Sequence, residues 1–204
     1  MIRNIIFDFG GVILKHKSTL MEDKIAEIFS IPLEQALKIW TEWKPLLMTG
    51  KISSEQFLEK VKNELQSDKS LSDILQNWKD IYIKEAEGVD WELLAFIEKL
   101  KNNYQVFLFT DTIDTHDEYN STRGINNKFT QVFKSHIEKL TKLNNNAFIN
   151  VLKKINAKPS ECILIDDLEE NIKRAEDLGI KGIVYKNTKD LIKTLIEVGI
   201  KVSI

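Results

Sequence analysis

The sequence predicts an α/β fold, a doubly wound parallel sheet with an inserted helical segment, and three observations carry this prediction. Short apolar runs alternate along most of the chain with amphipathic helical patterns, which is typical of a parallel sheet covered by helices on both faces. One segment, residues 18–86, breaks the alternation with helical patterns alone. The length, 204 residues, suits one domain that carries a smaller insertion.

The strands are predicted from short runs that are apolar on both faces, as in the central strands of a parallel sheet. They are Ile5–Phe9, Val106–Phe109, Ile163–Ile165, Ile183–Tyr185 and, more weakly, Val132-Phe133. The first run ends in Gly10-Gly11, which predicts a tight turn. Helical patterns cover residues 93–100, 148–155 and 172–178, and Gly179 closes the last of them. Cys162, the only cysteine, falls in an apolar run and is interpreted as a buried strand residue rather than a nucleophile.

The inserted segment predicts about four amphipathic helices that form a small bundle. We therefore divide the chain into a core domain, residues 1–17 and 87–204, and a helical cap domain, residues 18–86. Ser53 and Gln56 predict a capping box, Pro45 is expected to kink the second helix, and Trp40 and Trp43 are interpreted as packing residues. Because the segment follows the first strand, we expect it above the carboxyl ends of the strands, where ligands bind in open sheets.

Composition excludes some function classes and partners. Lys plus Arg number 29 against 31 Asp plus Glu, so the chain lacks the basic surplus of a nucleic-acid binder. No stretch approaches the roughly 20 apolar residues that cross a bilayer, and Asp8 interrupts the apolar start that a signal peptide would need. We expect a soluble, cytoplasmic protein without nucleic-acid or membrane partners, as a monomer or a homodimer.

Polar side chains follow three of the predicted strands where each strand ends: Asp8, Thr110-Asp111 and Asp166-Asp167. The carboxyl ends of parallel strands face one crevice, so these groups should lie together. Carboxylates gathered at a crevice repel one another unless a cation neutralises them, and hard oxygen ligands suit Mg²⁺. The sequence thus predicts a magnesium site. Lys142 could supply a second positive charge there, although a lysine taken alone is more often on the solvated surface.

In order and spacing, these groups resemble the motifs of the haloacid dehalogenase superfamily over nearly the whole chain. Phe7–Ile13 is similar to the first motif, Phe109–Asp111 to the second, Lys142 to the third and Ile165–Asn171 to the fourth. The insertion resembles the small helical cap of that superfamily, with Thr49–Ser53 and Phe57 as a recurring cap segment. Ser135-His136 fits the branch that has glycine in place of the second aspartate of the first motif.

The resemblance implies a Mg²⁺-dependent phosphatase of a small phosphorylated metabolite, such as a sugar phosphate, that works through an aspartyl phosphate. It implies Asp8, Thr110 and Lys142 as catalytic residues, with Asp8 as the nucleophile. The implied metal ligands are Asp8, the backbone carbonyl of Gly10, Asp167 and Asp166, the last nearby or bridged by water. Thr110, Asp111 and Lys142 would bind substrate phosphate.

Three departures from the family pattern modify these expectations. Gly10 stands where many members have an acid, which predicts a preference for sugar 1-phosphates, acyl phosphates or aryl phosphates over poorer leaving groups. The sequence Lys142–Asn145 lacks the prolines of the family's lysine loop, which predicts a less rigid loop. Asp111 adds a negative charge near the phosphate site; it is interpreted as a cap of the following helix, with a substitute acid as the alternative.

Two other functions stay open at this level. One is a binding or regulatory protein that keeps the fold and turns over poorly. The other is a dehalogenase that forms an ester at Asp8 and needs no metal, which the carboxylate pair argues against. Surface or turn roles are expected for His16, His116 and His136; for His16, which lies close in sequence to the first motif, a role as an acid is the alternative.

Overall fold

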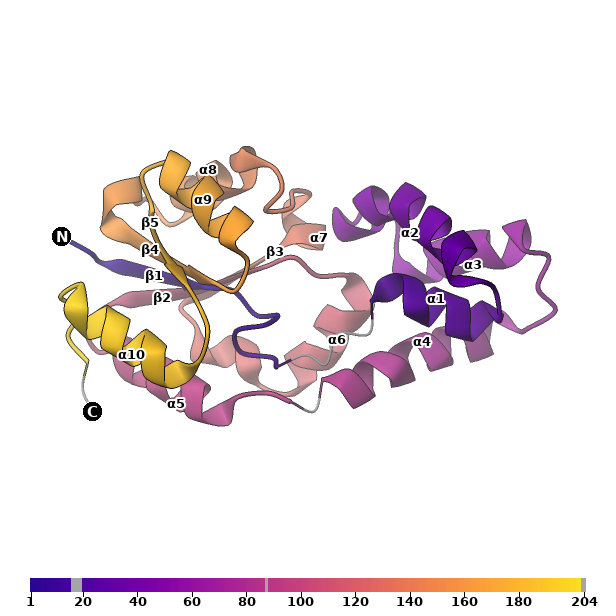
Figure 1. Ribbon diagram of the computed structural model, residues 1–204, viewed down its shortest axis with the longest axis horizontal. Coiled ribbons are helices and arrows are strands. Elements are labelled where there is room, and N and C mark those ends of the chain that lie inside the picture. Colours follow the sequence, from indigo (N-terminus) through magenta and orange to yellow (C-terminus); the bar gives the residue numbers. More distant parts are fainter. Residues whose placement is uncertain (16–19, 87, 203–204) are drawn as a thin grey trace.

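The computed structural model describes residues 1–15, 20–86 and 88–202, and a five-stranded parallel sheet lies at the centre of one half of the molecule (Figure 1). The strand order is β3-β2-β1-β4-β5, so the first strand has neighbours on both sides. The strands are β1 (Asn4–Phe7), β2 (Gln105–Thr110), β3 (Gln131–Lys134), β4 (Cys162–Asp166) and β5 (Lys181–Val184). The doubly wound α/β prediction is confirmed, including the weaker strand, and Cys162 is buried in β4 as expected.

Helices cover both faces of the sheet. Helices α5 (Trp91–Leu100) and α10 (Thr188–Glu197) lie against one face, and α8 (Asn145–Lys154) and α9 (Glu169–Asp177) against the other (Figure 1). Successive side chains of a strand point to opposite faces of the sheet, so both faces of β1 are apolar. Ile5 and Phe7 belong to one apolar cluster and Ile6 to the other. None of the helices in the described residues combines the length and the apolar character needed to cross a membrane.

Four short elements complete the core. They are α6 (Asp114–Thr122), η1 (Ile125–Lys128), α7 (Ser135–Glu138) and η2 (Pro159–Glu161). Helix α6 was not predicted, because the residues that it buries, Thr115 and Asn120, are polar and give no apolar stripe. Helix α10 was not predicted either, although Leu191 and Leu195 form its buried face.

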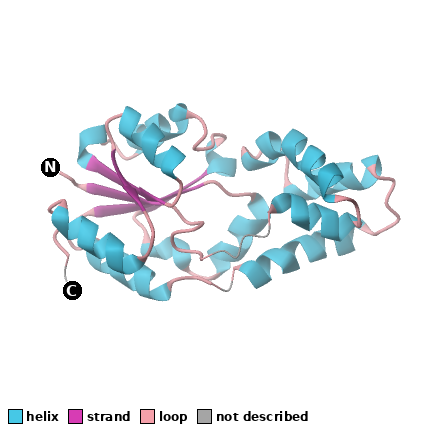
Figure 2. Cartoon of the chain, viewed as in Figure 1, coloured by secondary structure: helices cyan, strands magenta, loops and turns pink. Residues whose placement is uncertain are grey.

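Between β1 and α5, the described chain forms helices and no strand (Figure 2). Helices α1 (Met21–Phe29), α2 (Leu33–Met48), α3 (Ser54–Glu64) and α4 (Leu71–Glu85), the helical bundle hereafter, enclose an apolar cluster of their own. Ser53 and Gln56 form the predicted capping box, and α2 continues through Pro45. Trp40 is buried in this cluster and Trp43 packs against it. The division into core and cap at residues 17/18 and 86/87 stays a prediction.

The helical bundle is attached to the core through α6. The backbone N–H of Ser54 donates to the Asp114 carboxylate at 3.0 Å, and the Ser54 hydroxyl also bonds to it. Trp78 Nε1 donates to Thr115 Oγ1 at 3.2 Å, and Ile113, just before α6, is buried in the cluster of the bundle. Because α6 follows β2 directly, these bonds fix the helical bundle beside the carboxyl end of the sheet (Figure 1).

We predict that Thr115→Val destabilises the fold by about 1–3 kcal/mol, because it leaves the buried Trp78 N–H without its acceptor. Urea unfolding measures the change. Thr122→Val in the same helix is the matched control, since Thr122 is exposed and its hydroxyl bonds only to a carbonyl of its own helix. Equal stability losses in the two variants would contradict the proposed attachment.

Candidate active site

The acidic residues predicted at the strand ends lie together at one edge of the sheet. Asp8 directly follows β1, Asp166 ends β4, and Asp167 follows it. The two strands are neighbours, and the Asp8 N–H donates to the Ile165 carbonyl at 2.9 Å. After β1 the chain continues to β2 on one side of the sheet, and after β4 it continues to β5 on the other side. The crevice between the carboxyl ends of β1 and β4 is therefore the topological switch point of the sheet. Oxygens of the three carboxylates lie within 4.8 Å of one another.

Lys142 joins two of these carboxylates. Its Nζ lies 2.6 Å from Asp8 Oδ1 and 2.7 Å from Asp166 Oδ2, and the residue is 1% exposed. The general expectation of a solvated lysine is wrong here. Burial by itself would lower the pKa of Lys142, but the carboxylates of Asp8, Asp166 and Asp111 outweigh it and raise that pKa. The ammonium therefore stays charged across the physiological pH range.

The carboxylate oxygens of Asp166 accept hydrogen bonds from several groups of the protein. Besides the ammonium of Lys142, its carboxylate accepts the Leu168 N–H at 3.0 Å and the Asn171 side-chain amide at 3.1 and 3.2 Å. Asp166 is fully buried, whereas Asp167 is partly exposed and faces a cavity. Asn171 was not predicted as a site residue, although it lies in the fourth motif. The bonds indicate that Asp166 holds Lys142 and the β4 turn in place.

The two glycines after β1 make room for Asp167. The Phe9 carbonyl accepts the N–H groups of Ile13 and Leu14, which closes the turn. Gly11 has φ +71°, and a Cβ on it would lie 2.0 Å from Asp167 Oδ2. Any other residue would therefore displace the carboxylate and strain the backbone. Gly10 was predicted at the site; Gly11 was not, although the Gly-Gly pair was its signal.

Asp111 does not cap a helix, so that interpretation was wrong. Helix α6 begins at Asp114 with Ile113 as its N-cap residue and has no side-chain cap. Both oxygens of Asp111 instead accept the backbone N–H of Lys142 at 3.1 Å. Burial raises the pKa of Asp111, while Lys142 and Lys44 lower it. Its negative charge is thus partly offset by neighbours.

The lysine loop is held without the prolines of the family pattern. The Asn144 side chain accepts the Asn146 N–H at 2.9 Å and caps α8, and the Asn144 N–H donates to the Thr141 carbonyl at 2.9 Å. On the other side of Asp111, the Thr112 N–H donates to Ser135 Oγ at 2.9 Å. Hydrogen bonds within the lysine loop, and one between Thr112 and Ser135, therefore position the residues on both sides of the carboxylate cluster.

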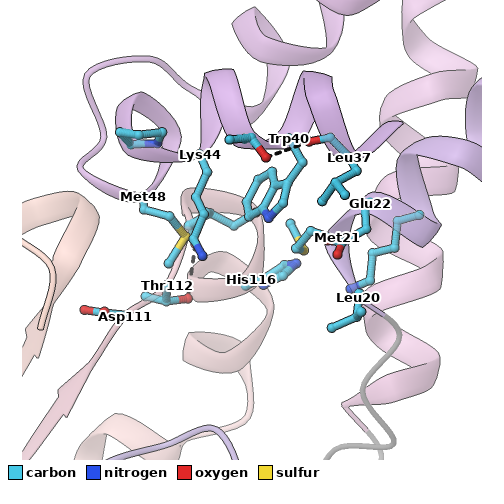
Figure 3. A pocket seen from close by; sticks show the side chains of 14 residues that line it. Leu20, Met21, Glu22, Leu37, Trp40, Lys44, Met48, Asp111, Thr112 and His116 are labelled. Atoms are coloured by element: carbon cyan, nitrogen blue, oxygen red, sulfur yellow. Dashed lines mark hydrogen bonds between the residues drawn. The ribbon is translucent and has the colours of Figure 1, made fainter. Parts of the chain in front are cut away.

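Two cavities meet at Asp111. The first, about 450 Å³, is lined by Asp8, Gly10, Gly11, Thr110, Asp111, Lys142, Asp167, Leu168 and Asn171. The second, about 600 Å³, lies between the helical bundle and the segment after β2, and Asp111 lines it too (Figure 3). Lys44 of α2 extends into it toward Thr112 (Figure 3). All predicted catalytic and phosphate-binding residues border the first cavity.

Neither His116 nor His136 borders the smaller cavity, which holds the carboxylates of the site. His116 is half-buried in α6, where its ring stacks on Tyr82 at 3.6 Å, and it borders the larger cavity. His136 Nε2 lies 3.4 Å from Asp117 Oδ2. Surface or turn roles were therefore wrong for both, because each is packed against a partner from another segment. His16 lies outside the described residues.

Residues 2–179 match the family of haloacid dehalogenase-like hydrolases. The chain belongs to this family. It is a hydrolase, and the match spans the β1 turn, the helical bundle and the β4 turn that carry the site.

Relatives and solved structures extend over most of the chain. D-ribitol-5-phosphate phosphatase of Bacteroides thetaiotaomicron is 25% identical over 203 residues, 93% of this chain and 95% of that protein. Flavin mononucleotide hydrolase 1 of Arabidopsis thaliana is 35% identical over 57 residues, 28% of this chain and 23% of that protein. The crystal structure of a family enzyme from B. thetaiotaomicron in complex with magnesium and inorganic phosphate superposes with a TM-score of 0.78 at 21% identity, covering 94% of this chain and 99% of that chain.

Burial gives Asp8 an unusual charge state in the metal-free protein. It raises the pKa of Asp8 from 3.8 to about 7; Lys142 lowers this pKa and the nearby Asp166 raises it. An acid with a higher pKa in the folded than in the unfolded state holds more protons when folded. The contribution of the protonated Asp8 carboxyl to the free energy of unfolding is therefore fully present below about pH 4 and is lost as pH rises through about 7.

We predict that Asp8→Asn is more stable than the parent protein at pH 8 and that the difference shrinks as pH falls to about 4, because the amide has no proton to lose. Urea unfolding in buffer containing a metal chelator measures both proteins. A variant less stable than the parent at pH 8, or a difference that is constant with pH, would contradict the assigned charge state.

Proposed function

We propose that this hydrolase is a Mg²⁺-dependent phosphatase of small phosphorylated metabolites that forms an aspartyl phosphate on Asp8. The observation that carries the proposal is the buried Lys142 ammonium between Asp8 and Asp166, with Asp167 beside them at the wall of a cavity of about 450 Å³. The phosphatase activity named for the B. thetaiotaomicron relative and the magnesium and phosphate of the similar structure support it.

The oxygen ligands around the cavity suit magnesium. Asp8 and Asp167 both border it, and the Gly10 backbone lies in the same wall. We assign direct ligation to these three, with the Asp166 oxygens engaged by Lys142, Leu168 and Asn171 and so available only through water. Bound Mg²⁺ would neutralise the carboxylates and orient a phosphate oxygen.

Asp8 is the nucleophile in this proposal. A carboxylate oxygen of Asp8 attacks phosphorus, the ester P–O bond breaks, and the departing oxygen takes its electron pair and a proton from water. A second water then attacks the phosphorus of the aspartyl phosphate, releasing inorganic phosphate and the Asp8 carboxylate. The positive charge of Lys142 offsets the charge that gathers on the phosphoryl oxygens.

Thr110 and Asp111 form the remaining wall of the phosphoryl site. The Thr110 hydroxyl, at the end of β2 and buried to 6% exposure, would donate a hydrogen bond to a phosphoryl oxygen. The Asp111 carboxylate would repel phosphate if it were free, but it accepts the Lys142 N–H and faces Lys44. Asp111 therefore shapes the site by holding the Lys142 backbone.

We predict that hydrolysis of p-nitrophenyl phosphate requires both Mg²⁺ and Asp8. Asp8→Asn should lower kcat by about 10³-fold or more, because the amide is not a nucleophile. Chelation of the metal should abolish turnover in the parent protein. Asp177→Asn, the same substitution at an exposed position of α9, is the control and should retain full activity. Turnover that survives in Asp8→Asn would exclude Asp8 as the nucleophile.

Gly10 predicts a steep dependence on the leaving group. A positioned acid typically contributes about 10² to 10⁴ in rate, and Gly10 has no side chain to supply it. Across a series of aryl and alkyl phosphates, kcat/KM should therefore fall as the pKa of the leaving alcohol rises. The same kcat/KM for esters of phenols and of simple alcohols would show that another group protonates the leaving oxygen.

A further inference from the structure

The larger cavity is where the remainder of the substrate would lie. It measures about 600 Å³, within the range of pockets that hold small organic molecules. Asp111 borders this cavity and the phosphoryl cavity, so the two are neighbours at that side chain. An ester with its phosphorus beside Asp8 can therefore extend its leaving group past Asp111 toward α2. This step rests on the proposed phosphatase function.

The wall on the helical-bundle side is largely apolar. Trp40, Met48 and Met21 surround the space in Figure 3, and Ile113 and Pro45 also border it. Leu20 and Leu37, on the same wall, are 55% and 46% exposed. Exposed leucines on the wall of a cavity are a surface that an apolar ligand can cover. Methionine side chains adapt to aromatic rings and make favourable sulfur contacts with them.

Several polar groups of the cavity are already engaged by protein. Thr41 Oγ1 donates to the Leu37 carbonyl at 2.8 Å, and the Thr112 N–H donates to Ser135 Oγ. The His116 ring is stacked on Tyr82. Glu22, Lys24 and Lys44 also border the cavity, but most of its lining surface is apolar. A polyol placed here would give up hydrogen bonds to water over much of that surface. Each hydroxyl buried without a partner lowers affinity.

The geometry points to a phosphate monoester whose leaving group ends in a flat aromatic ring system, with the ring packed between α2 and the segment after β2. Apolar walls, two methionines and an indole favour such a ring over a polyol of similar length. The specificity-determining side chains are Leu37, Trp40 and Met48, and Lys44, with its Nζ 6.0 Å from the Trp40 ring centroid, adds a cation at the same wall.

Two esters test this with the chemistry of the leaving group held constant. Flavin mononucleotide and D-ribitol 5-phosphate are both primary esters at the end of a ribityl chain, and only the first carries an aromatic ring system. We expect kcat/KM for flavin mononucleotide to be higher by about tenfold or more. Equal values, or a preference for D-ribitol 5-phosphate, would overturn the inference and leave the phosphatase function standing.

A matched pair of variants tests whether the ring of the substrate lies against the α2 wall of the cavity. Leu37→Asn puts an amide into the cavity wall, so the ratio of kcat/KM for flavin mononucleotide to that for D-ribitol 5-phosphate should fall about threefold or more. Leu33→Asn is the control, because Leu33 is 51% exposed, lies one turn earlier in α2 and does not border the cavity. The inference is wrong if the ratio changes equally in both variants or in neither.

Binding separates a failure of this inference from a failure of the proposed function. With Asp8→Asn and Mg²⁺, calorimetry should give a dissociation constant for flavin mononucleotide about tenfold or more below that for D-ribitol 5-phosphate. Equal affinities overturn the inference whatever the turnover. If the parent protein hydrolyses neither ester nor p-nitrophenyl phosphate, the proposed function fails, and the two affinities still decide whether the cavity selects the ring.

Discussion

The buried ammonium of Lys142 is the interaction on which the rest of the site depends. It lies within 2.7 Å of carboxylate oxygens of both Asp8 and Asp166, in a setting where either carboxylate without a cation would be strongly destabilising. With Asp167 included, three carboxylates face one ammonium. When all three are ionised, two negative charges are left over, which matches the charge of a divalent cation.

The backbone around Lys142 explains why this side chain reaches the carboxylates. Asp111, at the end of β2, accepts the Lys142 N–H, and Asn144 caps α8 two residues later. Asp166, the last residue of β4, accepts a hydrogen bond from the ammonium at the other end of Lys142. The ends of two strands and the start of one helix are thus joined through one residue. A substitution at Lys142 would disturb the arrangement of the site as well as its charge.

Helix α6 connects the helical bundle to the edge of the sheet that carries the carboxylates. It starts three residues after Asp111, and its Asp114 and Thr115 bond to Ser54 and Trp78 of the bundle. Thr110 and Asp111 on the phosphoryl side, and the cavity wall of α2 on the other, are therefore fixed relative to one another. This arrangement brings an apolar wall beside a strongly charged centre without burying the carboxylates in it.

The sequence predicts the strand-end acids because parallel strands present their carboxyl ends at one edge, and Asp8, Asp166 and Asp167 do lie there. Lys142 was considered as a second positive charge, but only the family resemblance assigned it to the site, since its loop has no periodic pattern. The partner of Asp111 is the N–H of a residue 31 positions away, which a local interpretation as a helix cap could not find. The polar buried face of α6 likewise left no apolar signal.

The excess of negative charge at the strand ends is tested most directly by Mg²⁺ binding in the absence of substrate. Thermal unfolding of the parent protein should shift to higher temperature as Mg²⁺ is added, because the ion binds only the folded carboxylate cluster. Asp167→Asn should lose most of that shift, and Asp177→Asn on the surface of α9 should keep it. Equal shifts in all three proteins, or no shift in the parent protein, would contradict the account.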